Sequence, residues 1–125
     1  MPNKATILVV DDEDAALQLL QDALLAVGYE VFAARDGVQA WAALESGAIK
    51  APDLLLTDLV MPNMDGMELA RKVIHAYPKT KILFTSGYAD DVVYANQELA
   101  GASAFLPKPF DAGGLQRRVK ELVGA

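Results

Sequence analysis

The sequence predicts an α/β fold in which helices cover both faces of a parallel β-sheet. Several short runs are continuously apolar or β-branched, among them Thr6–Val10 and Leu54–Thr57, which is typical of strands buried on both faces. Longer segments between these runs carry apolar residues at helical spacing. Strands that alternate with helices, joined by right-handed crossovers, form a parallel sheet.

The size and composition of the chain narrow its functional class. Its 125 residues suffice for one domain with a single core. The net charge of -6 argues against a direct nucleic-acid partner, which normally needs a basic patch. The absence of cysteine excludes disulfides and thiolate chemistry. No signal segment or membrane-spanning run is visible, so we expect a soluble, cytoplasmic domain with no membrane contact.

The first strand, Thr6–Val10, leads into a helix that we expect to be capped or begun by Asp14. Gly28 predicts the end of that helix, because glycine readily adopts the left-handed conformation that closes one. A short strand over Glu30–Ala34 follows. The helix before this strand, which begins near Asp14, has one apolar face formed by Leu17, Leu20, Leu24 and Val27.

Asp36 begins the next helix. The run Asp36-Gly37-Val38-Gln39 has the form of a capping box, in which an acidic N-cap is followed three residues later by glutamine. This helix carries Trp41 and Leu44 and is expected to end near Gly47. Pro52-Asp53 then forms the turn into the central strand, which ends at Asp58.

A second capping box, Asp65-Gly66-Met67-Glu68, begins a helix that is expected to end before Pro78. Lys81–Thr85 is the fourth predicted strand. The helix predicted over Asp90–Leu99 has few apolar residues and is the least strongly indicated element.

Ala102–Leu106 is the fifth predicted strand and leads into Pro107-Lys108-Pro109-Phe110. Asp111 precedes the last helix. The apolar stripe of that helix consists of Leu115, Val119 and Leu122. Five strands therefore alternate with five helices.

Four of these strands end in polar functional groups, which are the candidate site residues. In a parallel sheet all carboxyl ends lie on one edge, so groups far apart in the sequence can converge there. An ionised carboxylate at the end of a buried strand is not core filling, because it is seldom buried without a partner. The residues are Asp11 and Asp12, Asp58, Thr85, and Lys108.

This combination suits phosphoryl chemistry. Neighbouring carboxylates repel one another and form an oxygen-rich site for a hard divalent cation such as Mg²⁺. Lys108 can supply positive charge to phosphoryl oxygens, and the Thr85 hydroxyl can donate a hydrogen bond to one of them. An aspartate such as Asp58 can itself be the nucleophile and form an aspartyl phosphate.

Four motifs together resemble the receiver domain of two-component response regulators. They cover almost the whole chain in the family's order and spacing. The motifs are Val9-Val10-Asp11-Asp12-Glu13, Asp58-Leu59-Val60-Met61-Pro62-Asn63-Met64-Asp65-Gly66, Phe84-Thr85-Ser86-Gly87 and Lys108-Pro109-Phe110. The resemblance is to chemotaxis-regulator-like receivers. It implies a flavodoxin-like doubly wound sheet with the strand order 2-1-3-4-5, one of the common doubly wound arrangements. It also implies a single receiver domain over residues 1–125.

The resemblance also implies roles for individual residues. Asp58 would be the phosphoacceptor. Mg²⁺ would be bound directly by Asp12, Asp58 and the backbone carbonyl of Val60, with Asp11 acting mainly through water. Lys108 would pair with Asp58 at rest and with the phosphoryl group afterwards.

A switch and a set of partners follow from the same resemblance. Thr85 would move toward the phosphoryl group and Phe105 would turn inward behind it, while the Lys108-Pro109 peptide bond would be cis. The phosphodonor would be a phosphohistidine on a histidine kinase or histidine phosphotransfer protein. A downstream protein would bind the face made by the fourth helix, the fifth strand and the last helix, and phosphorylation could also promote a homodimer. Beyond its own phosphorylation and dephosphorylation, the chain would not be an enzyme.

Three positions depart from patterns that other receivers show. Val60 and Gly87, each two residues after a site residue, offer no polar side chain to a water that attacks the phosphoryl group. Phe105 lacks the hydroxyl of a tyrosine at the switch position. The chain is expected to be either a stand-alone receiver or part of a larger protein such as a hybrid kinase. The run Thr85–Ala89 is similar to receivers of hybrid kinases.

Other functions stay open. A flavodoxin-like cofactor binder would need a phosphate loop after the first strand, where acids Asp11 to Asp14 stand instead. An aspartate-nucleophile phosphatase would need a general acid two residues after the nucleophile, where Val60 stands. A degenerate receiver that acts only as a binding module is a further alternative. His75 is interpreted as a surface residue, and Trp41 and the methionines as packing residues.

Overall fold

The structure, a computed structural model, describes residues 4–87 and 103–124. In chain order the elements are β1 (Thr6–Val10), α1 (Asp14–Ala26), β2 (Glu30–Ala34), α2 (Gly37–Glu45), β3 (Leu54–Asp58), α3 (Gly66–Ala76), β4 (Lys81–Ser86), β5 (Ser103–Pro107) and α5 (Ala112–Val123). The helix predicted over Asp90–Leu99 lies outside the described residues, which contain four helices. None of these four is long and apolar enough to cross a membrane.

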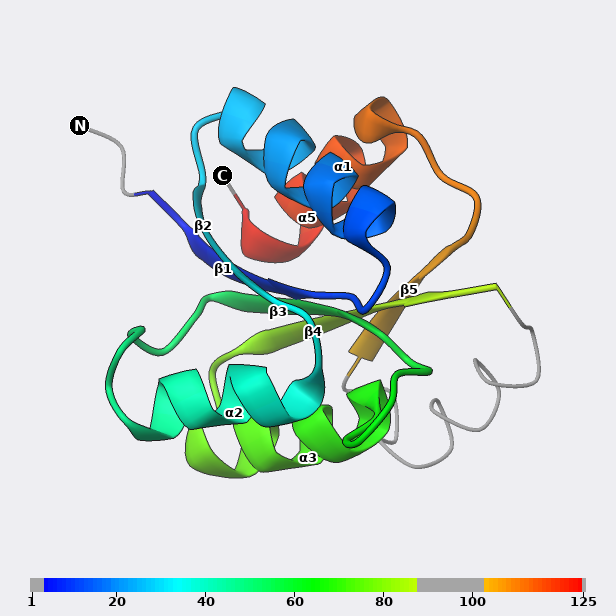
Figure 1. The fold of residues 1–125 in the computed structure, drawn as a ribbon. Coiled ribbons are helices and arrows are strands. Elements are labelled where there is room, and N and C mark those ends of the chain that lie inside the picture. The colour runs from blue at the N-terminus through cyan, green and yellow to red at the C-terminus, as the bar shows by residue number, and fades with distance from the viewer. Residues whose placement is uncertain (1–3, 88–102, 125) are drawn as a thin grey trace.

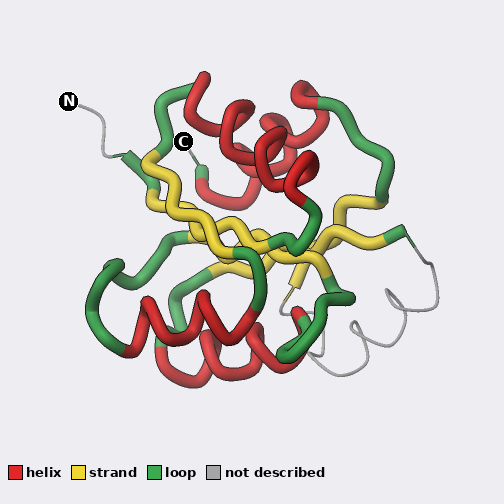
Figure 2. Tube along the Cα trace, viewed as in Figure 1, coloured by secondary structure: helices red, strands yellow, loops and turns green. Residues whose placement is uncertain are grey.

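The strands form one parallel sheet in the order β2-β1-β3-β4-β5. Helices α1 and α5 cover one face, and α2 and α3 cover the other (Figures 1 and 2). The predicted doubly wound fold and strand order are therefore confirmed. Because β3 lies between β1 and β4, its last residue, Asp58, emerges at the middle of the carboxyl edge of the sheet.

Two hydrophobic clusters fill the space between the sheet and its two helical layers. Successive residues of β1 alternate between them: Ile7 and Val9 pack toward α1 and α5, while Leu8 and Val10 pack toward α2 and α3. All four side chains are essentially inaccessible to solvent. Since both faces of the strand are buried, its sequence is continuously apolar. Each such side chain contributes about 1.5–3 kcal/mol by leaving water.

The predicted N-caps Asp36 and Asp65 are confirmed, and Asp111, which was expected to precede the last helix, is its N-cap as well. The carboxylates of Asp36, Asp65 and Asp111 each accept a hydrogen bond from the backbone N–H three residues later. Such a cap typically contributes about 1 kcal/mol. The reciprocal bond of the first capping box is displaced by one residue, because Oε1 of Gln39 accepts from the backbone N–H of Arg35.

The first helix differs from prediction at its end. Its buried face contains Leu17, Leu20 and Leu24, as predicted, and Gly28 has the expected positive φ of 94°. The prediction that Val27 shares this face is wrong. Helical spacing would bury Val27 only if the helix continued, but α1 ends at Ala26 and Val27, the C-cap, is 51% exposed.

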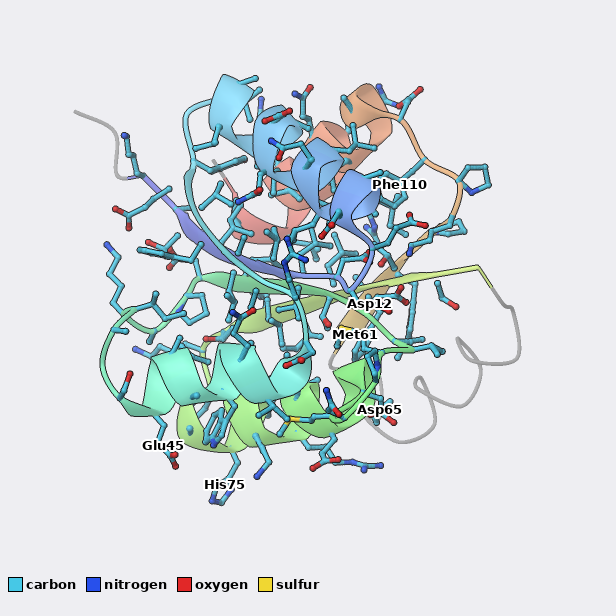
Figure 3. The ribbon with its side chains drawn as sticks, viewed as in Figure 1. Asp12, Glu45, Met61, Asp65, His75 and Phe110 are labelled. Carbon is cyan, nitrogen blue, oxygen red and sulfur yellow. The ribbon has the colours of Figure 1, made fainter. Side chains whose placement is uncertain are left out.

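The other elements differ little from their predicted bounds. Strands β4 and β5 each extend one residue further than predicted, and their last residues, Ser86 and Pro107, are paired in register. The side chain of His75 is exposed on α3, away from the carboxyl edge (Figure 3). Trp41 is half-buried against the core, and the ammonium of Lys72 lies 5.5 Å from its ring centroid. The methionines that pack in this cluster are Met61, Met64 and Met67.

Candidate functional site

The carboxyl edge of the sheet brings three of the predicted acids together. Asp11 and Asp12 follow β1, and Asp58 ends the neighbouring β3. One carboxylate oxygen from each of the three lies within 4.8 Å of the others. Asp11 is buried, Asp58 is partly buried and Asp12 is exposed, so the cluster opens to solvent on one side. Figure 3 places Asp12 at the same end of the sheet as Met61 and Asp65.

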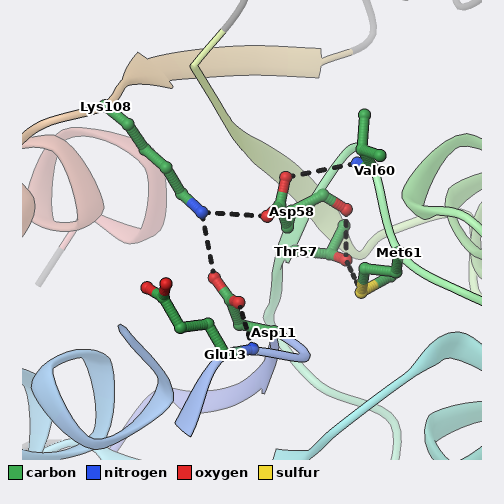
Figure 4. A network of polar contacts seen from close by, with 7 residues as sticks. All are labelled: Asp11, Glu13, Thr57, Asp58, Val60, Met61 and Lys108. Atoms are coloured by element: carbon green, nitrogen blue, oxygen red, sulfur yellow. Dashed lines mark hydrogen bonds and ion pairs between the residues drawn. The ribbon is translucent and has the colours of Figure 1, made fainter. Parts of the chain in front are cut away.

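Lys108, from the segment after β5, lies between two of these acids (Figure 4). Its Nζ is 2.9 Å from Oδ2 of Asp58 and 3.3 Å from Oδ2 of Asp11. The lysine backbone is fixed as well, since its N–H donates to the carbonyl of Ser86 at 2.8 Å and the Lys108-Pro109 peptide bond is cis. The contact between Lys108 and Asp58 is the one that the resemblance to receiver domains implies. The contact with Asp11 was not foreseen, because nothing in the sequence indicates which acid of the run after β1 points inward.

Burial and neighbouring charges act in opposite directions on the pKa values of Asp11 and Lys108. The Asp11 side chain is only 1% exposed, and its burial raises its pKa, although the hydrogen bond from the backbone N–H of Glu13 and the charge of Lys108 oppose that rise. Burial acts to lower the pKa of Lys108, but its hydrogen bond to Asp58 and the two negative charges outweigh this and raise it. Lys108 is therefore positively charged at neutral pH.

The carboxylate of Asp58 is held on both sides. While Oδ2 receives the ammonium of Lys108, Oδ1 accepts a hydrogen bond from the backbone N–H of Val60 at 3.2 Å. The side chain of Val60 is 57% exposed in the loop directly after β3. The preceding residue, Thr57, donates from its buried hydroxyl to the backbone carbonyl of Asp58 at 3.0 Å (Figure 4).

Thr85 lies beside Asp58 with an unsatisfied hydroxyl. The two residues are register partners in β3 and β4, and the carbonyl of Thr85 accepts from the backbone N–H of Leu59. Oγ1 of Thr85 is buried and has no hydrogen-bond partner among the residues that the structure describes. Nearby on β5, Phe105 is half-buried and stacks against Phe84, with ring centroids 5.6 Å apart. A buried hydroxyl without a partner calls for an explanation, and a site that binds an anion can supply one.

Gly66 makes the approach of α3 to the site geometrically feasible. A Cβ at this position would overlap the backbone carbonyl of Asp58. The backbone N–H of Gly66 donates to the carbonyl of Leu59 at 3.0 Å. The sequence places Gly66 in a capping box and in the receiver motif but does not predict its close approach to Asp58. No local pattern reveals this role, because the close approach depends on how α3 packs against the end of β3.

The donor set fits a hard divalent cation. Three carboxylates face one lysine, so the cluster carries excess negative charge, and all its ligand atoms are oxygens, which Mg²⁺ and Ca²⁺ prefer. Burial of Asp11 makes the repulsion between the acids stronger than it would be on a solvated surface. The cluster could therefore hold a metal ion, with Asp12 as its exposed ligand.

Comparison with known proteins agrees with this geometry. The family model of the response regulator receiver domain matches residues 7–120. The chain is 32% identical to the response regulator receiver protein CpdR of Brucella abortus, covering 94% of this chain and 95% of CpdR. It is 38% identical to the sensor kinase CckA of the same organism, over 98% of this chain but only 13% of that much longer protein.

A solved structure gives the same result. The chemotaxis response regulator CheY4 of Vibrio cholerae superposes with a TM-score of 0.83 at 29% identity, covering 96% of this chain and 99% of that one. The match includes the five-stranded sheet whose carboxyl edge carries Asp11, Asp12 and Asp58. The chain belongs to the family of response regulator receiver domains of two-component systems.

Proposed function

We propose that Asp58 accepts a phosphoryl group from a phosphohistidine of a sensor histidine kinase or a histidine phosphotransfer protein. The observation that carries this proposal is the position of the Asp58 carboxylate, which is partly exposed at the middle of the carboxyl edge and contacts the ammonium of Lys108 at 2.9 Å. The carboxylates of Asp11 and Asp12 lie beside it. A nucleophile, a cation for phosphoryl oxygens and a metal-binding cluster thus occupy one small site.

In the transfer, a carboxylate oxygen of Asp58 forms a bond to phosphorus as the bond between phosphorus and the imidazole nitrogen breaks. The imidazole keeps the electron pair of that bond. The ammonium of Lys108 is positioned to stabilise negative charge on the phosphoryl oxygens, and the spare hydroxyl of Thr85 can donate to one of them. Because positioning and charge stabilisation supply most of the catalysis of phosphoryl transfer, no further acid or base is required.

We propose Mg²⁺ as the cofactor. Asp12, Asp58 and the backbone carbonyl of Val60 would bind it directly, and Asp11 would act mainly through water. The engagement of both Asp11 oxygens, one with the N–H of Glu13 and the other with Lys108, supports this indirect role. When bound, the ion neutralises the acids and withdraws charge from the phosphoryl oxygens.

Thr85 and Phe105 are proposed as the switch. Movement of the Thr85 hydroxyl toward the phosphoryl group would empty space beside β5, and Phe105, already half-buried against Phe84, could turn further inward. A small local charge change would thereby alter the face that includes β5 and α5, where a downstream protein target would bind or a homodimer would form. The predicted helix Asp90–Leu99, the third part of that face, lies outside the described residues.

The chain is proposed to act as one cytoplasmic receiver unit over residues 1–125 that catalyses only its own phosphorylation and dephosphorylation. Its relatives include both a protein of similar length, CpdR, and a much longer sensor kinase, CckA. Either context would present the same Asp58 site to a phosphohistidine.

Treatment with Mg²⁺ and a small phosphodonor, followed by intact-mass measurement, tests the assignment. We expect one added phosphoryl group on the wild type and none on Asp58→Ala. Asp53→Ala is the matched control, because Asp53 is an acid at the opposite end of the same strand, where its carboxylate accepts from the backbone N–H of Thr6. Undiminished phosphorylation of Asp58→Ala would refute the proposal.

A further inference from the structure

The loop between β3 and α3 is attached to the N-terminus of α2, an element that contributes no residue to the acidic cluster. Nδ2 of Asn63, in the middle of this loop, donates to Oδ2 of Asp36 at 3.3 Å. The other oxygen of Asp36 accepts from the backbone N–H of Gln39, so the cap of α2 is shared with the loop. Asn63 also has a positive φ of 70°, a conformation that asparagine tolerates better than most residues.

A second contact, one residue further along, is steric. Gly37, the first residue of α2, is buried against Met64. A Cβ added to Gly37 would lie 2.7 Å from the backbone oxygen of Met64 and 2.9 Å from its Cβ. Met64 is itself buried in the core, 8% exposed, so it has little room to move away.

The start of the same loop is the part that faces the site. The N–H of Val60 donates to Oδ1 of Asp58, and the carbonyl of Leu59 accepts from Gly66. The loop is therefore fixed at its two ends by β3 and α3. In between, Met61 packs in the core and contacts the Thr57 hydroxyl, and Asn63 and Met64 lie against α2. Only Met61 and Pro62 lie between Val60 and Asn63 in the chain, so a displacement at Asn63 can reach Val60 through two intervening residues.

We propose that Asn63 and Gly37 are positioning residues for metal binding: they hold the β3–α3 loop against α2 so that the carbonyl of Val60 and the carboxylate of Asp58 are placed for the cation. The inference rests on the proposed function, in which these two groups are metal ligands. Residues that orient metal ligands without touching the ion commonly change metal affinity by about tenfold or more when they are replaced.

Calorimetric titration with Mg²⁺ alone, on the unphosphorylated protein, tests the proposal. Asn63→Gly keeps the positive φ accessible but removes the amide that contacts Asp36. Gly37→Ala leaves the amide in place but forces Met64 to shift. Both variants are expected to bind Mg²⁺ about tenfold more weakly than the wild type. The free energy of unfolding in metal-free buffer is measured in parallel.

Gly47→Ala is the matched control for a purely structural effect. Gly47 follows the other end of α2 and has a φ of 81°, and a Cβ there would have no neighbour within 4 Å in the part of the chain that the structure describes. Alanine there strains the backbone and lowers stability without contact with the loop. We expect Gly47→Ala to be less stable than the wild type but to bind Mg²⁺ with the same Kd.

The outcomes separate the two proposals. If the wild type binds Mg²⁺ in an Asp12-dependent manner but Asn63→Gly and Gly37→Ala keep its Kd, the positioning role is wrong while the proposed function stands. If Gly47→Ala weakens Mg²⁺ binding as much as Asn63→Gly and Gly37→Ala do, the Mg²⁺ affinity depends only on the stability of the fold. The positioning role is then overturned as well. If the wild type shows no Asp12-dependent binding, the proposed metal site fails and the positioning role fails with it. If Gly37→Ala does not fold, Asn63→Gly alone decides.

Discussion

The ammonium of Lys108 lies 2.9 Å from Oδ2 of Asp58, although the two residues are separated by 50 positions in the sequence. The same ammonium reaches the buried carboxylate of Asp11 at 3.3 Å. In the resting protein one lysine therefore offsets part of the repulsion among three neighbouring acids. The stability of the fold and the chemistry of the site depend on the same contacts.

Replacement of Lys108 by methionine should destabilise the metal-free protein by about 1–3 kcal/mol, because a buried acceptor, Asp11, loses its charged partner. Added Mg²⁺ should reduce the difference in the free energy of unfolding between Lys108→Met and the wild type, since the ion supplies the missing positive charge. Urea unfolding with EDTA and with Mg²⁺ measures both quantities. Lys79→Met, at an exposed position, is the control. Equal stability of wild type and Lys108→Met in EDTA would contradict the prediction.

Magnesium should raise the melting temperature of the wild type. Binding to the folded state alone stabilises it by RT ln(1 + [L]/Kd), and the ion relieves repulsion among Asp11, Asp12 and Asp58. Asp12→Ala should abolish most of this shift, and Asp22→Ala, an exposed acid of α1, should retain it. The measurement is a thermal melt at several Mg²⁺ concentrations. An equal shift in wild type and Asp12→Ala would place the metal elsewhere.

Asp11→Asn should become progressively more stable than the wild type as the pH of metal-free buffer rises from 3.8 toward neutrality. Burial raises the folded-state pKa of Asp11 above its ordinary value of 3.8, so the folded state holds this proton more tightly than the unfolded state. Ionisation therefore costs the wild type stability as pH rises through the raised pKa. Asparagine does not titrate. Urea unfolding across this range tests the sign, and a difference that is independent of pH would contradict it.

Phosphorylation should change amide exchange in β5 and α5 as well as around Asp58. The unsatisfied hydroxyl of Thr85 is the proposed link, because it has a donor available for the phosphoryl group and its strand pairs with β5. Hydrogen exchange with and without a phosphoryl mimic measures the change. Thr85→Ala should keep the changes near Asp58 and lose those in β5 and α5. Changes confined to the surroundings of Asp58 in the wild type would argue against the proposed switch.

The aspartyl phosphate should decay more slowly than in fast chemotaxis-type receivers. Hydrolysis needs a water placed in line with the departing carboxylate oxygen, and Val60 and Gly87 have no polar side chain to hold one. Both positions can accept a larger polar residue, since Val60 is 57% exposed and a Cβ at Gly87 meets no atom of the described residues within 4 Å. Val60→Asn and Gly87→Glu should each speed the decay.

A timed decay assay on the isolated phosphorylated protein gives the rates. Val38→Asn, at an exposed apolar position on α2, controls for a general effect of surface polarity. An unchanged or slower decay in Val60→Asn or Gly87→Glu would mean that water positioning at these two sites does not limit the lifetime. Free entry of water through the open position at Gly87 would then be the better explanation.

Local features of the sequence were sufficient to predict most of the fold. Continuous apolar runs identify doubly buried strands, and the caps Asp36, Asp65 and Asp111 act within three residues of themselves, so neither depends on the rest of the chain. The acids that follow β1 and β3 could also be placed at one edge, because all strands of a parallel sheet end there. Val27 was misplaced since periodicity alone does not say where a helix stops.

Tertiary structure alone decided which of these groups touch. The contact of Lys108 with Asp11 spans 97 positions, and that of Asn63 with Asp36 spans 27. The first contact depends on how neighbouring strands are staggered, and the second on how closely α2 approaches the β3–α3 loop. No local sequence pattern encodes either of these relationships. Burial is likewise a property of the assembled fold: Asp11 and Asp12 are adjacent acids, yet packing buries the first and leaves the second in water, where it is accessible to a metal ion.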